Sequence, residues 1–207
     1  MAKNIDLDAI SSFFTKTLAR HGETPKGVDW NGEESQLLRF EQISKIITGD
    51  SPFTLNDFGC GYGAYFEFLE RRYPSFAYTG IDIAAPMITA AAARLADRSN
   101  ATFVCGAAPK TRADYCVASG VFNMKLNHSP GEWQEYVESM LEAMSAACER
   151  GFSFNCLTGY SDPEKMRADL YYADPCYFFD LCKKKYSRNV ALLHDYDLYE
   201  FTILVRK

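Results

Sequence analysis

Leu55-Asn-Asp-Phe-Gly-Cys-Gly-Tyr-Gly-Ala-Tyr-Phe-Glu-Phe-Leu69 is the stretch of this 207-residue chain that decides its fold. An apolar run ends at Asp57, glycines alternate at Gly59, Gly61 and Gly63, and an aromatic run follows. This order predicts a strand, a glycine turn and a helix. Because glycine accepts positive φ and has no Cβ, a ligand can approach the backbone of such a turn closely. The amides at the start of the following helix would then face an anionic group.

Three interpretations of this stretch compete. The simplest is a glycine-rich connection without a ligand. Gly59, Gly61 and Ala64 also fit the spacing of the dinucleotide-binding fingerprint. The whole segment, an acidic residue followed by three alternating glycines, resembles the signature of class I S-adenosylmethionine-dependent methyltransferases.

The rest of the chain decides among these interpretations. Hydrophobic patterning predicts helices at 5–20 and around 37–47, another after Pro86, and one that starts at Ser129 and closes at Gly151. A second capping box, Ser161 to Glu164, predicts a helical region through Tyr172. Strands are expected at 53–57, 77–83, 101–105, 113–119, 152–157, 189–194 and 198–205.

The last two strands have hairpin spacing, and no stretch remains after them for the second domain that a dehydrogenase of this fold usually needs. Seven strands with a returning last strand are the pattern of the class I methyltransferases. The resemblance therefore implies a single α/β domain over residues 1–207. We expect a three-layer sandwich whose seven-stranded, mostly parallel sheet has the order 3-2-1-4-5-7-6, with strand 7 antiparallel and helices on both faces. Residues 1–50 would form an N-terminal helical lid, and 51–207 a Rossmann-like core with a cap segment at 159–188.

Charge and cysteine content narrow the partners. A net charge of −5 works against a large phosphate-binding surface, and the one basic cluster, Lys183 to Lys185 with Arg188, is short. Seven scattered cysteines show neither metal-ligand spacing nor a disulfide framework, and three of them, Cys105, Cys116 and Cys156, fall in apolar runs expected to be buried. Without a signal core or a membrane-length apolar run, the sequence predicts a cytoplasmic protein with no metal, no nucleic-acid partner and no membrane contact.

The resemblance also implies residues for the cofactor S-adenosyl-L-methionine. Gly59 and Gly61 would lie against its amino-acid part, Asp57 near its amino group, and Asp82 on the ribose hydroxyls. The third strand ends without the acidic residue that many family members place against the adenine amine, so backbone groups near Ala107 are expected to hold adenine. The other expected cofactor contacts are Trp30, Arg39, Cys60, Gly63, Ile83, Ser119, Gly120 and Phe122.

Catalysis and acceptor binding are less constrained by the sequence. His128 follows the fourth strand and is the candidate general base. Asn123, Tyr160, Tyr171 and Tyr172 are candidates for binding a small or medium-sized organic acceptor. Trp133, Tyr136 and Met140 fall on one helix face and are expected in the core. Two alternative functions stay open: an inactive subunit that binds the cofactor, and a nucleic-acid or protein methyltransferase. The oligomeric state is open as well.

Overall fold

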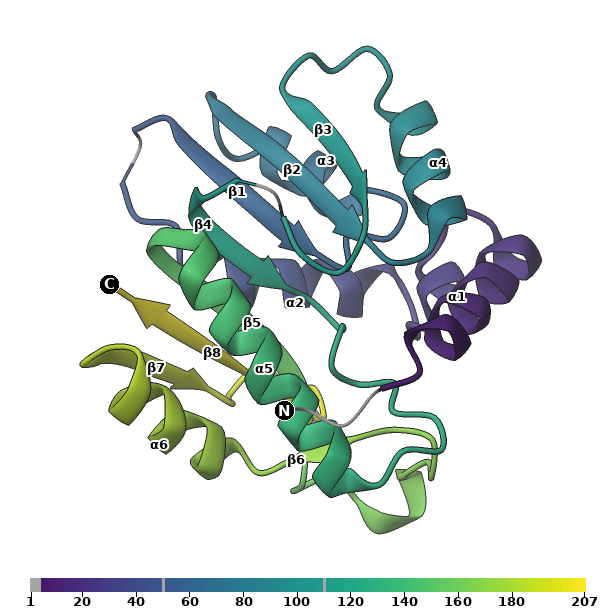
Figure 1. Cartoon of the computed structure of the whole chain (residues 1–207), viewed down its shortest axis with the longest axis vertical. Coiled ribbons are helices and arrows are strands. Elements are labelled where there is room, and N and C mark those ends of the chain that lie inside the picture. Colours follow the sequence, from purple (N-terminus) through teal and green to yellow (C-terminus); the bar gives the residue numbers. More distant parts are fainter. Residues whose placement is uncertain (1–4, 50, 110) are drawn as a thin grey trace.

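The computed structural model describes residues 5–49, 51–109 and 111–207 (Figure 1). Its helices are α1 (Leu7–His21), α2 (Glu33–Ser44), α3 (Ala64–Glu70), α4 (Ala85–Arg94), α5 (Pro130–Ala147) and α6 (Pro175–Lys185), with short 3-10 turns η1 (Pro25–Val28) and η2 (Pro163–Lys165). Its strands are β1 (Phe53–Phe58), β2 (Phe76–Asp82), β3 (Ala101–Cys105), β4 (Ala113–Ala118), β5 (Cys148–Thr158), β6 (Tyr172–Ala173), β7 (Asn189–Leu193) and β8 (Glu200–Arg206).

All of these strands join one sheet, in the order β3-β2-β1-β4-β5-β8-β7. β1 to β5 pair in parallel, whereas β8 runs antiparallel to both of its neighbours, β5 and β7. The predicted order of seven strands and the antiparallel last strand are confirmed. The additional strand β6 pairs with the end of β5.

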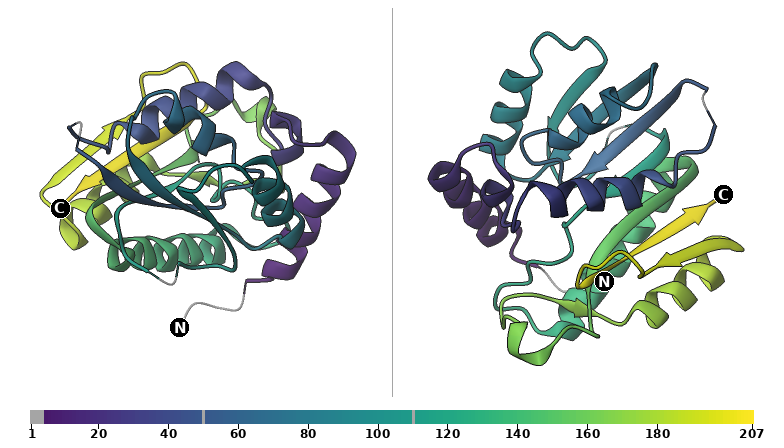
Figure 2. Two further views of the ribbon diagram at one scale, coloured as in Figure 1. Left: turned by 90° about the horizontal axis from the view of Figure 1, so that it is seen from above. Right: turned by 180° about the vertical axis from the view of Figure 1, so that it is seen from behind.

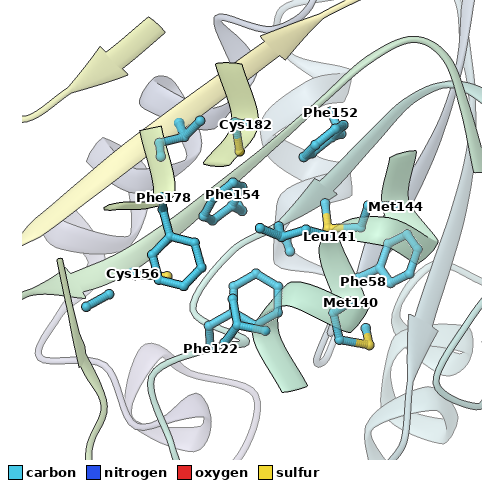
Figure 3. Packing of buried hydrophobic residues seen from close by; sticks show 14 of the residues in the cluster. Phe58, Phe122, Met140, Leu141, Met144, Phe152, Phe154, Cys156, Phe178 and Cys182 are labelled. Carbon is cyan, nitrogen blue, oxygen red and sulfur yellow. The ribbon is translucent and has the colours of Figure 1, made fainter. Parts of the chain in front are cut away.

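Helices cover both faces of the sheet and bury a separate apolar cluster on each. On one face, Phe40 and Ile43 of α2 pack with Phe66 and Leu69 of α3. On the other, Leu141 and Met144 of α5 and Phe178 and Cys182 of α6 pack with Phe152 and Phe154 of β5 (Figure 3). Trp133 of α5 belongs to the same cluster. Seen from above, α2 and α5 lie on opposite sides of the strands, which is the expected three-layer arrangement (Figure 2). α1 packs against η1 and α4.

Local sequence signals account well for α5. Ser129 accepts from the amide of Glu132, and the Glu132 side chain accepts from the Ser129 amide, so the predicted capping box is present. The helix ends at Ala147, and Gly151, expected to close it, instead lies inside β5. A Cβ at Gly151 would come within 2.4 Å of the Val205 carbonyl oxygen, so this glycine is needed for strand packing.

The prediction of a helix at 161–172 is wrong. The Ser161 hydroxyl donates to the carbonyl of Thr158 at 2.7 Å instead of capping a helix, and only η2 forms. Tyr172 pairs with Leu157 as part of β6. Pairing with the end of β5 thus outweighed the local helix signal. Cys105 is exposed, contrary to expectation, while Cys116 and Cys156 are buried. Among the described residues, no helix is both long and apolar enough to cross a bilayer.

Candidate functional site

A cavity of about 1000 Å³, its mouth included, opens at the carboxyl ends of β1, β2 and β4. This is the edge at which open α/β sheets bind ligands. Its walls come from the glycine turn, the segment after β4, and helices α1, α2 and α5. We call it the first cavity. It is lined by most of the residues predicted to bind the cofactor: Trp30, Asp57, Gly59, Cys60, Gly61, Asp82, Ile83, Ala107, Ser119 and Gly120.

The glycine turn owes its shape to left-handed backbone at all three glycines. Gly59, Gly61 and Gly63 have φ of 69°, 54° and 85°, which residues with a Cβ rarely adopt. The amides of Gly59 and Cys60 both donate to the Ile81 carbonyl, so the turn is fastened to the end of β2. The turn therefore places its glycines at the cavity wall while much of its hydrogen bonding stays within the protein.

The Asp82 carboxylate bridges two loops at the cavity wall. Its Oδ2 accepts from the Gly61 amide at 3.0 Å and its Oδ1 accepts from the Ala84 amide at 2.8 Å. Burial raises the pKa of this carboxyl, and the backbone hydrogen bonds oppose that rise. A carboxylate has about four lone-pair sites. After these two bonds, Asp82 still has acceptor capacity for a ligand hydroxyl.

Asp57 is the other carboxyl in the first cavity, and it is almost fully buried at 3% exposure. The Tyr78 hydroxyl donates to its Oδ2 at 2.6 Å. Burial raises the pKa of Asp57 to about 7; the hydrogen bond from Tyr78 lowers it, and the nearby charge of Asp82 raises it further. Near neutral pH this carboxyl is divided between protonated and ionised forms. A cation placed beside it would favour the ionised form.

Several residues that line the first cavity were not predicted from the sequence. Trp133, Tyr136 and Met140 belong to the core face of α5, as expected, but they also form a wall of the cavity. Ile10 and Phe14 of α1 form another wall. Because α5 follows the carboxyl end of β4, where a ligand cleft was expected, the sequence could have indicated Trp133, Tyr136 and Met140. The resemblance predicted a helical lid from residues 1–50, but no local pattern singled out Ile10 and Phe14.

A second cavity, of about 1290 Å³ with its mouth, adjoins the first. Phe14, Val28, Trp30 and Gly120 line both cavities and so mark their junction. Trp30 lies directly over Gly120, where an added Cβ would be 2.9 Å from the indole ring. Of the predicted site residues, Arg39, Asn123 and Tyr172 line this second cavity.

A buried network forms the inner wall of the second cavity. Arg39 Nε and Nη2 donate to the two oxygens of Glu200 at 2.8 and 2.7 Å, and the Arg39 guanidinium lies 4.9 Å from the centre of the Trp30 ring. Asn123 donates to Glu200 at 3.4 Å and accepts from the Leu157 amide at 3.0 Å. Arg39 was predicted to contact the cofactor. The structure places it away from the first cavity, as the support of Trp30.

The remaining predicted site residues lie outside the lining of both cavities. The Cβ of a residue at Gly63 would meet Leu95 and Ala91, so Gly63 allows close packing on α4. The Phe122 ring points into the core below α5 (Figure 3). Tyr171 is buried in the same core and Tyr160 is 70% exposed. His128 lies beside Trp133 with 6.1 Å between ring centres, and its Nε2 accepts from the Asp6 amide at 3.2 Å.

Comparison with known sequences matches this chain to methyltransferases. A family model described as a methyltransferase domain matches residues 56–148. "Putative methyltransferase Rv1506c" of Mycobacterium tuberculosis (strain ATCC 25618 / H37Rv) is 56% identical over 163 residues, which are 79% of this chain and 98% of that protein. The trans-aconitate 2-methyltransferase of Rhodopseudomonas palustris (strain BisB18) is 33% identical over 109 residues, 48% of this chain and 42% of that enzyme.

Solved structures share the fold at low sequence identity. A DhpI-SAM-HEP complex superposes with a TM-score of 0.71 at 12% identity, covering the whole of both chains. Magnesium protoporphyrin IX methyltransferase (ChlM) from Synechocystis PCC 6803 with bound SAH gives 0.69 at 11% identity, covering 98% of this chain and 100% of that one. These likenesses show that the chain shares this fold over nearly its whole length.

Proposed function

Because this chain belongs to the class I S-adenosylmethionine-dependent methyltransferases, we propose that it methylates a small organic acceptor held in the second cavity, with the cofactor in the first. The observation that carries this proposal is the junction of the two cavities at Trp30 and Gly120. A methyl group can pass from one ligand to the other only where their sites meet. The comparisons support the enzyme class, and the acceptor is inferred from the cavity.

The first cavity fits the cofactor by its chemistry. Asp57 offers a carboxylate for a cationic amino group, and Asp82 retains acceptor capacity for ribose hydroxyls. Ala107 and Gly106 present backbone without large side chains at the wall expected to hold adenine. When bound, S-adenosylmethionine supplies an electrophilic methyl group on a positively charged sulfonium. The aromatic side chains of Trp30 and Tyr136 are suited to lie near such a charge.

The residues at the junction align the two ligands and keep water away from the reacting atoms. A displacement at a methyl group needs its reacting atoms in line and close together. Phe14, Val28, Trp30 and Gly120 bring no charged side chain to this place, so they exclude water from the reacting atoms. The Arg39–Glu200 pair fixes the position of Trp30 from behind. The protein thus acts mainly by holding the cofactor and the acceptor in the correct relative orientation.

The geometry does not favour the predicted role of His128 as a general base. Its Nε2 already accepts from the Asp6 amide, and its ring packs on Trp133 outside both cavity linings. A general base must come within hydrogen-bond reach of the proton that it removes. We therefore assign His128 no step in the transfer.

Cofactor binding is tested by calorimetry with S-adenosylmethionine and with its demethylated product. The wild type should bind both, and Gly61→Ala should abolish binding, because Gly61 has φ of 54° and a Cβ there would lie 3.1 Å from Val28. Gly131→Ala is the matched control, since nothing lies within 4 Å of its added Cβ. Binding of NAD with neither of these ligands would overturn the proposed cofactor.

The size of the acceptor is tested by supplying cofactor and dividing a cell extract into a small-molecule filtrate and a macromolecular retentate. Release of demethylated cofactor with the filtrate supports the proposal. Release with the retentate alone would overturn the small acceptor and favour a protein or nucleic-acid substrate.

A further inference from the structure

The second cavity is balanced in charge. Among the described residues, three cations and three carboxylates line it: Arg39, Lys165 and Arg167, and Asp29, Asp197 and Glu200. Each of the cations is already paired. Arg39 binds Glu200 at 2.7 Å, Arg167 binds Asp169 at 2.7 Å and Asp29 at 3.1 Å, and Lys165 lies 3.0 Å from Asp162.

These existing ion pairs argue against an anionic acceptor. A carboxylate or phosphate would have to displace one of the existing carboxylates from Arg167 or Lys165, and the bidentate Arg39–Glu200 pair is buried. Breaking a buried pair leaves an uncompensated charge. A neutral ligand keeps every pair intact.

Hydrogen-bonding groups nevertheless crowd the cavity wall. The Tyr172 hydroxyl accepts from the Arg167 amide at 2.9 Å, which leaves its own O–H able to donate. Asp29 Oδ2 accepts from Arg167, and the described residues offer no hydrogen-bond partner to Asp29 Oδ1. Flat aromatic surfaces from Trp30 and Tyr199 stand among these polar groups. The cavity wall thus offers a hydrogen-bond donor and an acceptor next to aromatic faces. A ligand ring with hydroxyl groups on its edge and C–H bonds on its faces is complementary to such a wall.

We propose that the acceptor is a neutral sugar and that one of its hydroxyl groups is methylated. This inference rests on the proposed function and specifies the substrate class of the same site. A cavity of this size accommodates a monosaccharide alone or at the end of a larger glycoside. Each sugar hydroxyl both donates and accepts, so it can use Tyr172 and Asp29 together.

The transfer step balances with the groups present. A lone pair of the sugar hydroxyl oxygen forms the new C–O bond to the methyl carbon, and the C–S bonding pair stays on sulfur, which becomes a neutral thioether. The hydroxyl proton passes to the Asp29 carboxylate and then to solvent. Asp29 precedes Trp30, the junction residue, and its ion pair with Arg167 fixes the orientation of its carboxylate.

The first test is binding, without turnover. Saturation-transfer NMR uses methyl α-D-glucopyranoside, methyl α-D-mannopyranoside and methyl α-L-rhamnopyranoside with the protein and the demethylated cofactor. At least one glycoside should receive saturation. Tyr172→Phe should weaken the binding about tenfold, the effect of one lost hydrogen bond. Asp195→Asn, in the exposed loop near Asp197 but outside the lining, is the control and should bind as wild type.

The second test is turnover with labelled cofactor. Three arms, the methyl glycosides, nucleotide-activated hexoses and a short oligosaccharide, distinguish the source of the sugar, and trans-aconitate and succinate are the carboxylate comparators. The expected product is a methyl ether that resists mild alkali. Asp29→Asn should lower kcat about a hundredfold while saturation transfer persists, as for loss of a proton acceptor.

The outcomes are distinct. A base-labile methyl ester on a carboxylate, or intact cofactor binding with no saturation transfer to any glycoside and no methyl ether, would overturn the sugar acceptor. If Asp29→Asn turns over as fast as wild type, the proton does not go to Asp29. Failure to bind the cofactor at all would count against the proposed function instead.

Discussion

At the residue scale, Asp82 is the side chain on which the first cavity most depends. It joins the glycine turn to the loop before α4 through the amides of Gly61 and Ala84. It is also the proposed partner of the ribose. A single carboxylate therefore shapes the site and contacts the ligand.

Replacing Asp82 with alanine should weaken cofactor binding by about 10- to 150-fold, which corresponds to about 1.5–3 kcal/mol for a hydrogen bond to a charged group. Asp82→Asn should lose less, because its amide oxygen can still accept one of the two backbone bonds. Isothermal titration with the demethylated cofactor measures both. The exposed Asp97→Ala serves as the control. Equal affinity for Asp82→Ala and wild type would contradict the assignment.

Asp57 should make cofactor binding depend on pH. Its pKa is raised to about 7 in the free protein by burial, and a cationic amino group beside it needs the ionised form. Affinity should therefore rise by about eightfold between pH 6 and pH 7.5, as the ionised fraction rises from about a tenth to about three quarters. Titrations at several pH values measure this slope. Asp57→Asn should bind more weakly and with a flat profile over this range; a flat profile for wild type would refute the role.

The same raised pKa has the opposite consequence for stability. The unfolded carboxyl ionises near pH 3.8, whereas the folded carboxyl stays protonated until about pH 7. The native state therefore binds more protons between these values. The contribution of Asp57 to folding stability is present below pH 4 and declines as pH rises toward 7.

At the element scale, the buried pair of Arg39 and Glu200 fastens α2 to the start of β8. Both elements contribute to the inner wall of the second cavity. Both side chains are less than 10% exposed, so neither can exchange its partner for water at low cost. The position of Trp30 depends on this link.

Glu200→Gln should destabilise the protein by about 3–5 kcal/mol, because it leaves the Arg39 charge buried without its partner. The matched control is Glu41→Gln, which removes the partner of Arg72 in a pair whose side chains are nearly half exposed. That change should cost less than about 1 kcal/mol. Urea unfolding of both variants gives the comparison. A loss below 1 kcal/mol for Glu200→Gln would show that the pair does not fasten α2 to β8.

At the scale of the whole molecule, the two cavities sit between the N-terminal helices and the sheet, so ligand binding joins parts of the chain that are far apart in sequence. The first cavity is lined from Ile10 of α1 to Met140 of α5. A ligand that binds only this assembled state must stabilise the whole fold.

The demethylated cofactor at a hundred times its Kd should stabilise the protein by about 2.7 kcal/mol. For a domain of this length that corresponds to a rise in Tm of about 5–11 °C. Thermal unfolding followed by circular dichroism measures it, with NAD at the same concentration as the control. An equal shift with NAD, or none with the demethylated cofactor, would contradict the proposed site.

Local signals in the sequence determined the glycine turn and the cap of α5. These signals lie within a few residues of one another: Ser129 with Glu132, and the alternation of Gly59, Gly61 and Gly63. Backbone conformation, capping and strand alternation are local properties, so they can be predicted without knowing the partners of a segment. The order of the strands then followed from the family pattern.

Only the tertiary structure decided which side chains share a cavity. Arg39 and Glu200 are 161 positions apart, and no pattern along the chain indicates that they form an ion pair. Because of this pair, the Arg39 side chain lies outside the first cavity. The segment at 161–172 carried a local helix signal, but Tyr172 paired with Leu157 of β5 instead. Which side chains become neighbours depends on packing between distant parts of the chain. The secondary structure of a segment such as 161–172 depends on it too, because the free energies of burial and strand pairing exceed the small intrinsic helix propensity of a short segment.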